Sequence, residues 1–293
     1  MALIEADLLA ARVGRDSGVR RVKVIRPVSF SLRDLWSGLI GLADYRDLLI
    51  ALSAHRLKVR YKQSVLGIAW AIIQPVALML IYTLVFSVVT RVKSTGVPYA
   101  VFAYAALLPW SFFSTALTNA TNGLVSHAQL VTKVYFPREI LPISYVVAAL
   151  VDLLVASIVM SALMMYYHVP LTLHSLWVIP ITLVMTAFVS GCSLVFSAMQ
   201  VRVRDIGMAM PLLLQLWMFA SPVVYPLHQV PERYREWYVL NPMVGIIENF
   251  RAALLGTGLD LHSLWISTLV SAALLPLAYL YFKRIEATVA DVI

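Results

Sequence analysis

The distribution of charged residues divides most of the chain into long apolar segments. Formal charges are absent from residues 63–90, 94–132 and 206–231, and Asp152 is the only one in residues 140–201. A helix needs about 20 apolar residues to cross a hydrocarbon layer of about 30 Å. The pattern therefore predicts an all-α integral membrane protein with six transmembrane helices, at residues 64–89, 99–123, 140–167, 176–199, 206–220 and 261–282.

Lysine and arginine predict the orientation of these spans, because cytoplasmic loops carry the excess of positive charge. Eleven lie near the spans on the side of both termini: Arg46, Arg56, Lys58, Arg60, Lys62, Lys133, Arg138, Arg202, Arg204, Lys283 and Arg284. Five lie on the other side: Arg91, Lys93, Arg233, Arg235 and Arg251. We therefore predict a basic cytoplasmic tail over residues 1–31, a membrane domain over 63–285, and a cytoplasmic C-terminus over 286–293.

The fifth apolar segment is short and is followed by two prolines. Pro222 and Pro226 end a helix near Ala220, since proline lacks the backbone donor and clashes with the preceding turn. Beyond them an amphipathic helix is predicted between Asn241-Pro242 and Gly256, with Glu248, Asn249 and Arg251 off its apolar stripe. We interpret residues 221–256 as a re-entrant outer hairpin at the exit of a pathway. The alternative is a surface loop with one helix lying on the headgroups.

Residues 32–62 precede the first span and combine two features. Apolar side chains recur at helical spacing from Leu32 to Ala43, which fits an N-terminal amphipathic helix on the cytoplasmic leaflet or against a partner. A dense basic cluster follows, and its members could bind lipid phosphates: Arg56, Lys58, Arg60 and Lys62. On a helix, Arg56 and Arg60 share one side, and Lys58 and Lys62 share roughly the opposite one. An orientation signal with a headgroup anchor would also explain the cluster, and a docking point for a lipid-linked diphosphate is the sharper hypothesis.

Other function classes find little support. The net charge of +8 is typical of basic loops on anionic headgroups rather than of nucleic-acid binding. The six histidines and the single Cys192 form no metal or catalytic pattern, so neither an enzyme nor a metal site is expected. Asp152 inside the third span is either an ion site or, as we favour, an interhelical hydrogen-bond partner. Aromatic residues of the spans are mostly packing residues, and these could line a path for sugars: Tyr82, Tyr104, Trp110, Phe113, Trp217 and Tyr225.

Several segments, in order along residues 45–285, resemble the membrane domain of type-2 ABC exporters for polysaccharides. They are RLKVRYKQSVLGIAWAIIQP (56–75), ALLPWSFF (106–113), LVTKVYFPRE (130–139), VRD (203–205), ASPVVYP (220–226) and LNPM (240–243). The resemblance is strongest to permeases that export O-antigen lipopolysaccharide, and permeases for capsule and teichoic acid are near relatives.

This resemblance implies a bacterial inner-membrane homodimer that carries an undecaprenyl-type lipid-linked polysaccharide. Two separate ATPase subunits would bind ATP and Mg²⁺, and the chain has no GxxxxGK[ST] loop. Residues 32–62 would form the substrate entrance, and residues 221–256 would form an outer gate that includes Pro222, Pro226, Asn241 and Pro242. The ATPase would be contacted by His127, Leu130, Lys133, Tyr135, Phe136 and Arg138, and by Arg202, Arg204 and Asp205. Two other function classes fit less well. An ion-coupled transporter would need several intramembrane carboxylates, and Asp152 is the only one. A transferase would need paired catalytic carboxylates.

Overall fold

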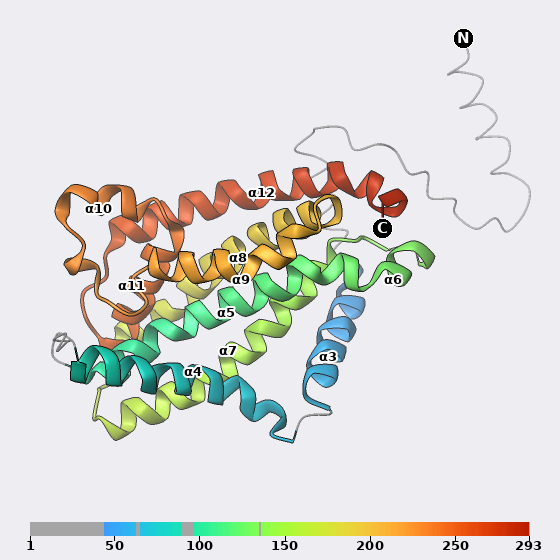
Figure 1. Ribbon diagram of the computed structural model, residues 1–293. Coiled ribbons are helices and arrows are strands. Elements are labelled where there is room, and N and C mark those ends of the chain that lie inside the picture. The colour runs from blue at the N-terminus through green and yellow to red at the C-terminus, as the bar shows by residue number, and fades with distance from the viewer. Residues whose placement is uncertain (1–43, 63–64, 90–96, 135, 293) are drawn as a thin grey trace, which may run out of the picture.

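The computed structural model describes residues 44–62, 65–89, 97–134 and 136–292 of the chain. The described residues form helices and turns and contain no strand (Figure 1). The α-helices are α3 (Arg46–Lys62), α4 (Trp70–Tyr82), α5 (Tyr99–Ser126), α6 (Ala128–Lys133), α7 (Ile140–Tyr166), α8 (Val178–Arg202), α9 (Asp205–Phe219), α10 (Glu232–Val239), α11 (Pro242–Leu255) and α12 (Leu261–Val292). Short 3-10 helices are η1 (Gly67–Ala69), η3 (Leu173–Trp177) and η4 (Leu227–Gln229), and α4 continues as a π-helix, η2 (Thr83–Val89).

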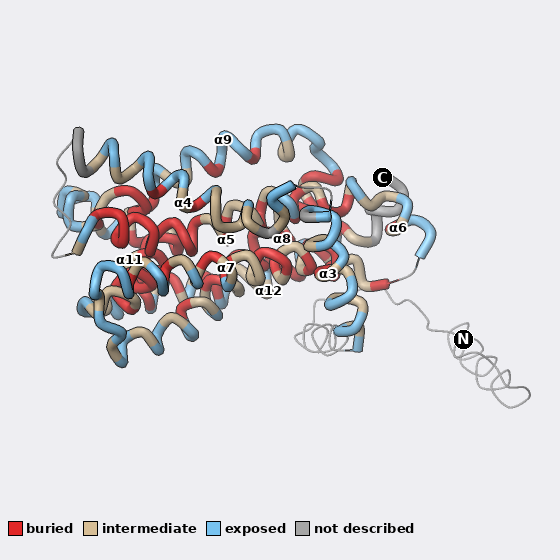
Figure 2. Tube along the Cα trace, turned by 90° about the horizontal axis from the view of Figure 1, so that it is seen from below, coloured by how far each residue is buried: buried red, intermediate tan, exposed pale blue. Residues whose placement is uncertain are grey.

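Helix α5 is the centre of the bundle. It packs against α4, α7, α8, α9 and α11, and most of its side chains are buried. Figure 2 shows buried residues concentrated along the inner helices and exposed residues along α9 at one side. Alanines at several α5 positions let neighbouring backbones approach closely, which favours helix packing where lipid removes the hydrophobic driving force.

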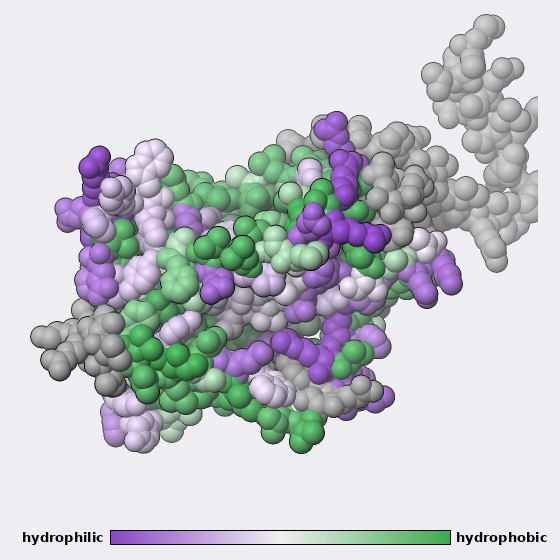
Figure 3. Space-filling model, in the orientation of Figure 1, coloured by the Kyte–Doolittle hydropathy of each residue, from purple (hydrophilic) through white to green (hydrophobic). Residues whose placement is uncertain are grey.

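Four of the six predicted spans are confirmed as helices long and apolar enough to cross a membrane: α5, α7, η3 with α8, and α12. Helices α4 and α9 are apolar but shorter. At 1.5 Å per residue, the 15 residues of α9 rise only about 22 Å. A full crossing by α4 and α9 therefore stays a prediction. In Figure 3, hydrophilic side chains gather at the two ends of the bundle and hydrophobic ones cover much of the length between.

Two helices differ in length from the spans predicted for them. Helix α4 begins at Trp70 rather than Ser64, and the residues before it bend at Gly67, whose backbone is left-handed (φ +50°). Helix α12 continues to Val292 instead of ending at Phe282. The Lys283 ammonium lies 2.8 Å from the Glu286 carboxylate one turn later, so these polar residues support a continuing helix. Of the predicted amphipathic helix, residues 32–43 lie outside the described residues.

The segment between α9 and α12 contains η4, α10 and α11. The predicted bounds of α11 are confirmed: the Asn241 side chain caps its first turn, and Gly256 ends it in a left-handed conformation (φ +70°). However, α11 packs against α5, α8 and α12, and both Asn249 and Arg251, expected on an outward polar face, are buried. A helix lying on the headgroups is therefore wrong, while a re-entrant path of the hairpin stays a prediction.

Candidate functional site

The basic residues of α3 point in two directions. Arg56 and Arg60 bond to side chains of α7, whereas Lys58 and Lys62 are exposed. This confirms the helical spacing from which Arg56 and Arg60 were placed on one side and the lysines on the other. The lysine side is therefore open toward lipid headgroups or solvent, and on the other side Arg60 is also partly exposed.

Arg56 fixes α3 to the beginning of α7. Its Nε donates to Ser144 Oγ at 2.7 Å, and its guanidinium carbon lies 3.4 Å from the centre of the Tyr145 ring. Burial lowers the pKa of Arg56, although a guanidinium stays charged at neutral pH. Its Nη2 is buried without a hydrogen-bond partner. Arg56 is therefore foremost a helix-packing residue, and it leaves one donor unused beside the entrance.

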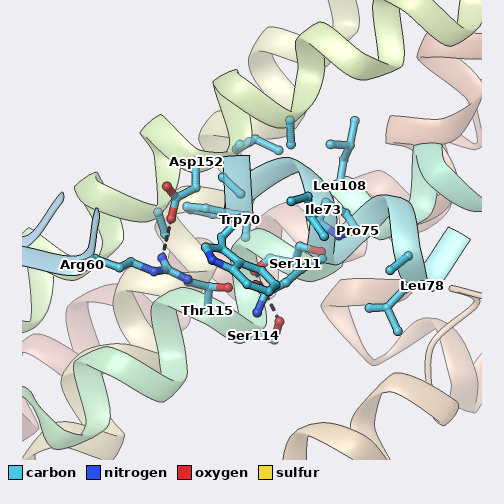
Figure 4. A pocket seen from close by; sticks show the side chains of 17 residues that line it. Arg60, Trp70, Ile73, Pro75, Leu78, Leu108, Ser111, Ser114, Thr115 and Asp152 are labelled. Carbon is cyan, nitrogen blue, oxygen red and sulfur yellow. Dashed lines mark hydrogen bonds and ion pairs between the residues drawn. The ribbon is translucent and has the colours of Figure 1, made fainter. Parts of the chain in front are cut away.

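Arg60 forms an ion pair with the intramembrane carboxylate that the sequence singled out. Arg60 Nη1 lies 2.6 Å from Asp152 Oδ2, with the Arg60 side chain 40% exposed and that of Asp152 15% exposed. This contact gives Asp152 an interhelical partner, as in the alternative that we favoured, and the role of Asp152 stays a prediction. The pair lies at one end of a cavity of about 440 Å³ between α3, α4, α5 and α7 (Figure 4).

The turn after α5 and helix α6 form a short elbow, residues 127–138, at the same end of the bundle as α3 (Figure 1). His127 caps α5 through a contact of 3.0 Å between its Nδ1 and the Gly123 carbonyl oxygen. Burial lowers the pKa of His127, and the charges of Arg56 and His55 lower it further. Of the other predicted coupling residues, Leu130 is half-buried, Phe136 is buried, Lys133 is exposed and Tyr135 lies outside the described residues.

The elbow is tied to the last helix by charged groups. The Arg138 backbone N–H donates to Glu286 Oε1 at 3.1 Å, and Arg138 Nη1 donates to the Glu286 carbonyl oxygen at 2.6 Å. Next to it, buried Glu139 accepts from Lys283 Nζ at 2.8 Å. Sequence reasoning identified Arg138 but missed Glu139, Lys283 and Glu286. Lys283 and Glu286 are one helical turn apart, and this spacing could have predicted that they form an ion pair.

A glutamine joins the elbow end to the turn between α8 and α9. Gln200 Nε2 donates to Asn122 Oδ1 at 3.3 Å and to the Arg204 carbonyl oxygen at 3.1 Å. Its Oε1 accepts from the backbone N–H of Gly207. Gln200 thereby ties α5, five residues before the elbow, to the second predicted coupling loop. These predicted coupling residues are exposed: Arg202, Arg204 and Asp205.

At the opposite end, Asn241 connects α9 to α11. Its Oδ1 accepts from Trp217 Nε1 at 3.0 Å and from the Met243 backbone N–H at 3.1 Å. Its Nδ2 donates to the Ala220 carbonyl oxygen and to Ser221 Oγ, both at 2.9 Å. All four polar contacts of this amide therefore hold the junction at which α9 ends and α11 begins.

Buried Arg251 holds the irregular backbone that follows α9. Arg251 Nη2 donates to the carbonyl oxygens of Pro222 at 2.6 Å and Val223 at 3.2 Å, and Nη1 lies 3.1 Å from Glu248 Oε2. Its guanidinium also lies 3.8 Å from the centre of the Phe102 ring. Non-helical backbone at membrane depth requires such partners. The predicted gate prolines are all buried here: Pro222, Pro226 and Pro242.

The six aromatic candidates fall into two groups. Tyr104, Trp110 and Phe113 are buried in the core around α5, which favours the packing interpretation for these three. Partly exposed are Tyr82, Trp217 and Tyr225, and Tyr82 Oη lies 3.6 Å from the Met218 sulfur across α4 and α9. No group of three or more metal-ligating side chains is placed to hold a metal ion among the residues that the structure describes.

Comparison with known proteins identifies the family. Residues 47–255, which include both predicted coupling loops and all of α11, match the model of the ABC-2 type transporter family. The chain belongs to this family. As an ABC-2 permease it is the multi-pass membrane subunit of an inner-membrane transporter and not an enzyme, and ATP hydrolysis occurs on a separate subunit.

Several curated relatives of this ABC-2 permease are similar over most of their length. An O-antigen export system permease protein RfbA of Myxococcus xanthus is 35% identical over 213 residues, which are 72% of this chain and 81% of the relative. An RfbA of Klebsiella pneumoniae is 28% identical over 84% of this chain and 95% of the relative. The polysialic acid transport protein KpsM of Escherichia coli is 26% identical over 75% of this chain and 88% of the relative.

Proposed function

We propose that this ABC-2 permease is the channel-forming subunit of an exporter that moves lipid-linked polysaccharide of the O-antigen type across the cytoplasmic membrane. The similarity to O-antigen permeases over most of both chains carries the proposal. Two copies of the chain would form the conduit, and two ATPase subunits would drive it. The substrate would be a polysaccharide on an undecaprenyl-type lipid.

The arrangement of the polar loops supports a coupling role for one end of the bundle. The elbow at residues 127–138 follows α5 directly, and Gln200 bonds Asn122 of α5 to the exposed turn at 202–205. Arg138 and Glu139 link the elbow to α12 by hydrogen bonds and an ion pair. A push on the elbow by an ATPase would therefore reach α8, α9 and α12 through polar contacts that are already made.

Exposed apolar side chains on α4 and α9 support the homodimer. Helices α4 and α9 touch at Tyr82 and Met218. The following residues are exposed on α4, its continuation η2 and α9: Leu80, Ile81, Leu84, Met208, Leu212 and Leu216. In this proposal a second copy covers part of this surface, and the partly exposed aromatic residues Tyr82 and Trp217 face the conduit between the copies.

A gene replacement tests the function. Deleting this gene, or the gene of its ATPase, should abolish surface polysaccharide and leave lipid-linked polymer inside the cell, as measured by gel electrophoresis of lipopolysaccharide and by extraction of inner-membrane lipids. Wild-type protein supplied from a plasmid should restore export. Continued export without any ATPase subunit would reject the proposal.

The exposed lysines of α3 allow a finer test of lipid docking. Each basic residue near an anionic surface is worth about 1 kcal/mol. Lys58→Gln with Lys62→Gln should therefore weaken capture of the lipid-linked substrate about 30-fold and reduce export, without disturbing the Arg56 and Arg60 contacts. Arg46→Gln, an exposed change on the same helix, is the matched control. Equal export by both variants would contradict a docking role.

Orientation can be tested with single thiols. We propose that the α3 and elbow end faces the cytoplasm. A cysteine at exposed Lys133 should react with a membrane-impermeant maleimide only after permeabilisation, and one at exposed Arg233 should react in intact spheroplasts. The native Cys192 is buried and gives little background. The reverse labelling pattern would refute the orientation.

A capsule-type polymer is the second candidate substrate, because KpsM is also similar over most of this chain. Staining for acidic capsule alongside the lipopolysaccharide gel separates the two candidates in the same deletion strain.

A further inference from the structure

We propose that one face of α5 hydrogen-bonds the sugar units of the exported polymer along a water-filled groove that opens toward the elbow. In this proposal, which rests on the proposed function, the contacts are made by uncharged side chains and concern the carbohydrate, not its lipid. We call this surface the α5 polar face, and it consists of Ser111, Ser114, Thr115, Thr118, Asn119 and Asn122. Their spacing of three and four residues places them on one side of the helix.

The exposure pattern of α5 over this stretch is that of a helix in water. Between Ser111 and Asn122, each side chain that is exposed or half-buried is serine, threonine or asparagine, and each buried one is apolar except Thr121. Two other spans have the opposite pattern, since α7 exposes Leu154 and Ile158 and α12 exposes Leu269 and Leu277. Polar side chains in a span face protein or water, because lipid tails offer them no hydrogen-bond partner. The α5 polar face is therefore not a lipid-facing surface.

The chemistry of the α5 polar face suits sugar hydroxyls. Asn119 Nδ2 donates to the Thr115 carbonyl oxygen at 2.7 Å, and Asn122 Nδ2 donates to the Thr118 carbonyl oxygen at 3.3 Å. Each bond uses one amide donor, while a side-chain amide has a second N–H and a carbonyl oxygen. Sugar hydroxyls both donate and accept, so they pair with such uncharged groups, whereas phosphates favour cations.

The α5 polar face also repeats along the helix axis. Positions 111, 115 and 119 form one row and positions 114, 118 and 122 form another, so similar groups recur about every 6 Å. A moving substrate needs sites that bind well enough for entry and weakly enough for release. Two rows of single neutral hydrogen bonds meet this requirement, because a sliding chain can exchange one contact for the next.

The exposed part of this side of α5 ends near the middle of the helix. Toward the outer end, Tyr104, Leu107 and Leu108 continue the same side and are fully buried. Ser111, Ser114 and Thr115 line the α5 wall of the cavity described above (Figure 4). Nearer the elbow, Asn119 and Ser126 are exposed. The groove is therefore open toward the elbow and closed toward the outer end.

Reactivity of single cysteines tests whether the α5 polar face meets water. The sample is inverted inner-membrane vesicles that contain the full permease–ATPase complex, and the reagent is a cationic methanethiosulfonate. Because thiolates form in water and not in lipid, Thr118→Cys and Asn119→Cys should react at least about tenfold faster than the control Leu277→Cys, at an exposed apolar position of α12. Equal rates at the three positions would overturn the proposal.

Oxidative cross-linking separates a groove from a contact between two copies of the chain. Polar side chains also join helices within membranes, so a second copy is the alternative occupant of this face. A disulfide requires Cα atoms within about 7 Å of one another. Thr118→Cys and Asn119→Cys should therefore remain single chains on non-reducing gels. A disulfide-linked dimer at either position would replace the groove with a surface between copies.

The export rate tests the hydrogen bonds to sugar. Thr118→Val with Asn119→Leu removes polar groups at similar volume and should lower the rate at which labelled polymer reaches the cell surface about fivefold. ATP hydrolysis by the purified complex should continue, whereas a defect in folding would lower both activities. Thr118→Ser with Asn119→Gln keeps the polar groups and should retain export. The control is Ser161→Leu at an exposed position of α7, where the hydroxyl donates to the Ser157 carbonyl oxygen at 3.1 Å, and it should export like wild type.

The outcome is separable from that of the proposed function. Unchanged export by Thr118→Val with Asn119→Leu would reject the sugar contacts even if the cysteines react with the reagent. Export that depends on this gene and on its ATPase would then still stand. Conversely, export without the ATPase would reject the proposed function even if the α5 polar face proved open to water.

Discussion

Replacing Arg251 by methionine should open the outer end of the protein. Methionine keeps much of the side-chain volume but removes two hydrogen bonds to carbonyl oxygens and the ion pair with Glu248, in a side chain only 4% exposed. Removing one partner of a buried ion pair costs about 3–5 kcal/mol. Each of the two carbonyl groups left without a donor adds about 1–3 kcal/mol. Since these effects overlap, we expect a loss of about 4 kcal/mol, confined mainly to residues 220–227.

The assay combines stability with local accessibility. The midpoint of unfolding in detergent should fall strongly for Arg251→Met. In the same variant, a cysteine at Val223, which is fully buried, should become reactive to an impermeant maleimide. Arg233→Met, the same change at an exposed site of α10, is the control. Adding Glu248→Gln should recover part of the loss, because the uncompensated carboxylate disappears. Identical unfolding of the Arg251 and Arg233 variants would refute the argument.

Two further predictions concern pH and helix packing. Burial lowers the pKa of His127 in the folded state, so its contribution to stability is complete above about pH 6.5, the unfolded value, and is lost as the pH falls toward the folded pKa. His127→Gln should therefore flatten the decline of the melting temperature below pH 6.5, and an unchanged decline would contradict this assignment. Gly245→Ala should weaken assembly of α11 on α12, because a Cβ there would collide with the Ser263 carbonyl oxygen. Gly258→Ala, where a Cβ meets open space, is the control, and equal melting temperatures for both would show that the collision is relieved.

The sequence was sufficient where the signal is local. The lengths of the uncharged segments predicted α5, α7, α8 and α12, because a helix needs a minimum number of apolar residues to cross the bilayer. Cap chemistry placed both ends of α11, since Asn241 can accept a backbone hydrogen bond and Gly256 tolerates a left-handed backbone. Helical spacing also sorted the basic residues of α3 correctly into two sides.

The errors arose where a distant element covers a residue. Asn249 and Arg251 fall on the polar side of α11, but α12 and the 222–223 backbone supply partners to that side, so it is buried. The periodicity of one helix does not show which distant elements pack over its polar side. Similarly, Asp152 was marked as unusual, but its partner Arg60 lies 92 residues away, and only the packing of α3 on α7 brings them together.

The Asn241-Pro242 junction has a consequence for chemical ageing. Asparagine usually deamidates when the next backbone nitrogen attacks its side-chain carbonyl, and the nitrogen of Pro242 has no hydrogen and cannot do so. The competing route, attack by Nδ2 on the asparagine's own main chain, is opposed because Nδ2 is held by Ala220 and Ser221. The joint between α9 and α11 is therefore resistant to both routes of spontaneous asparagine degradation.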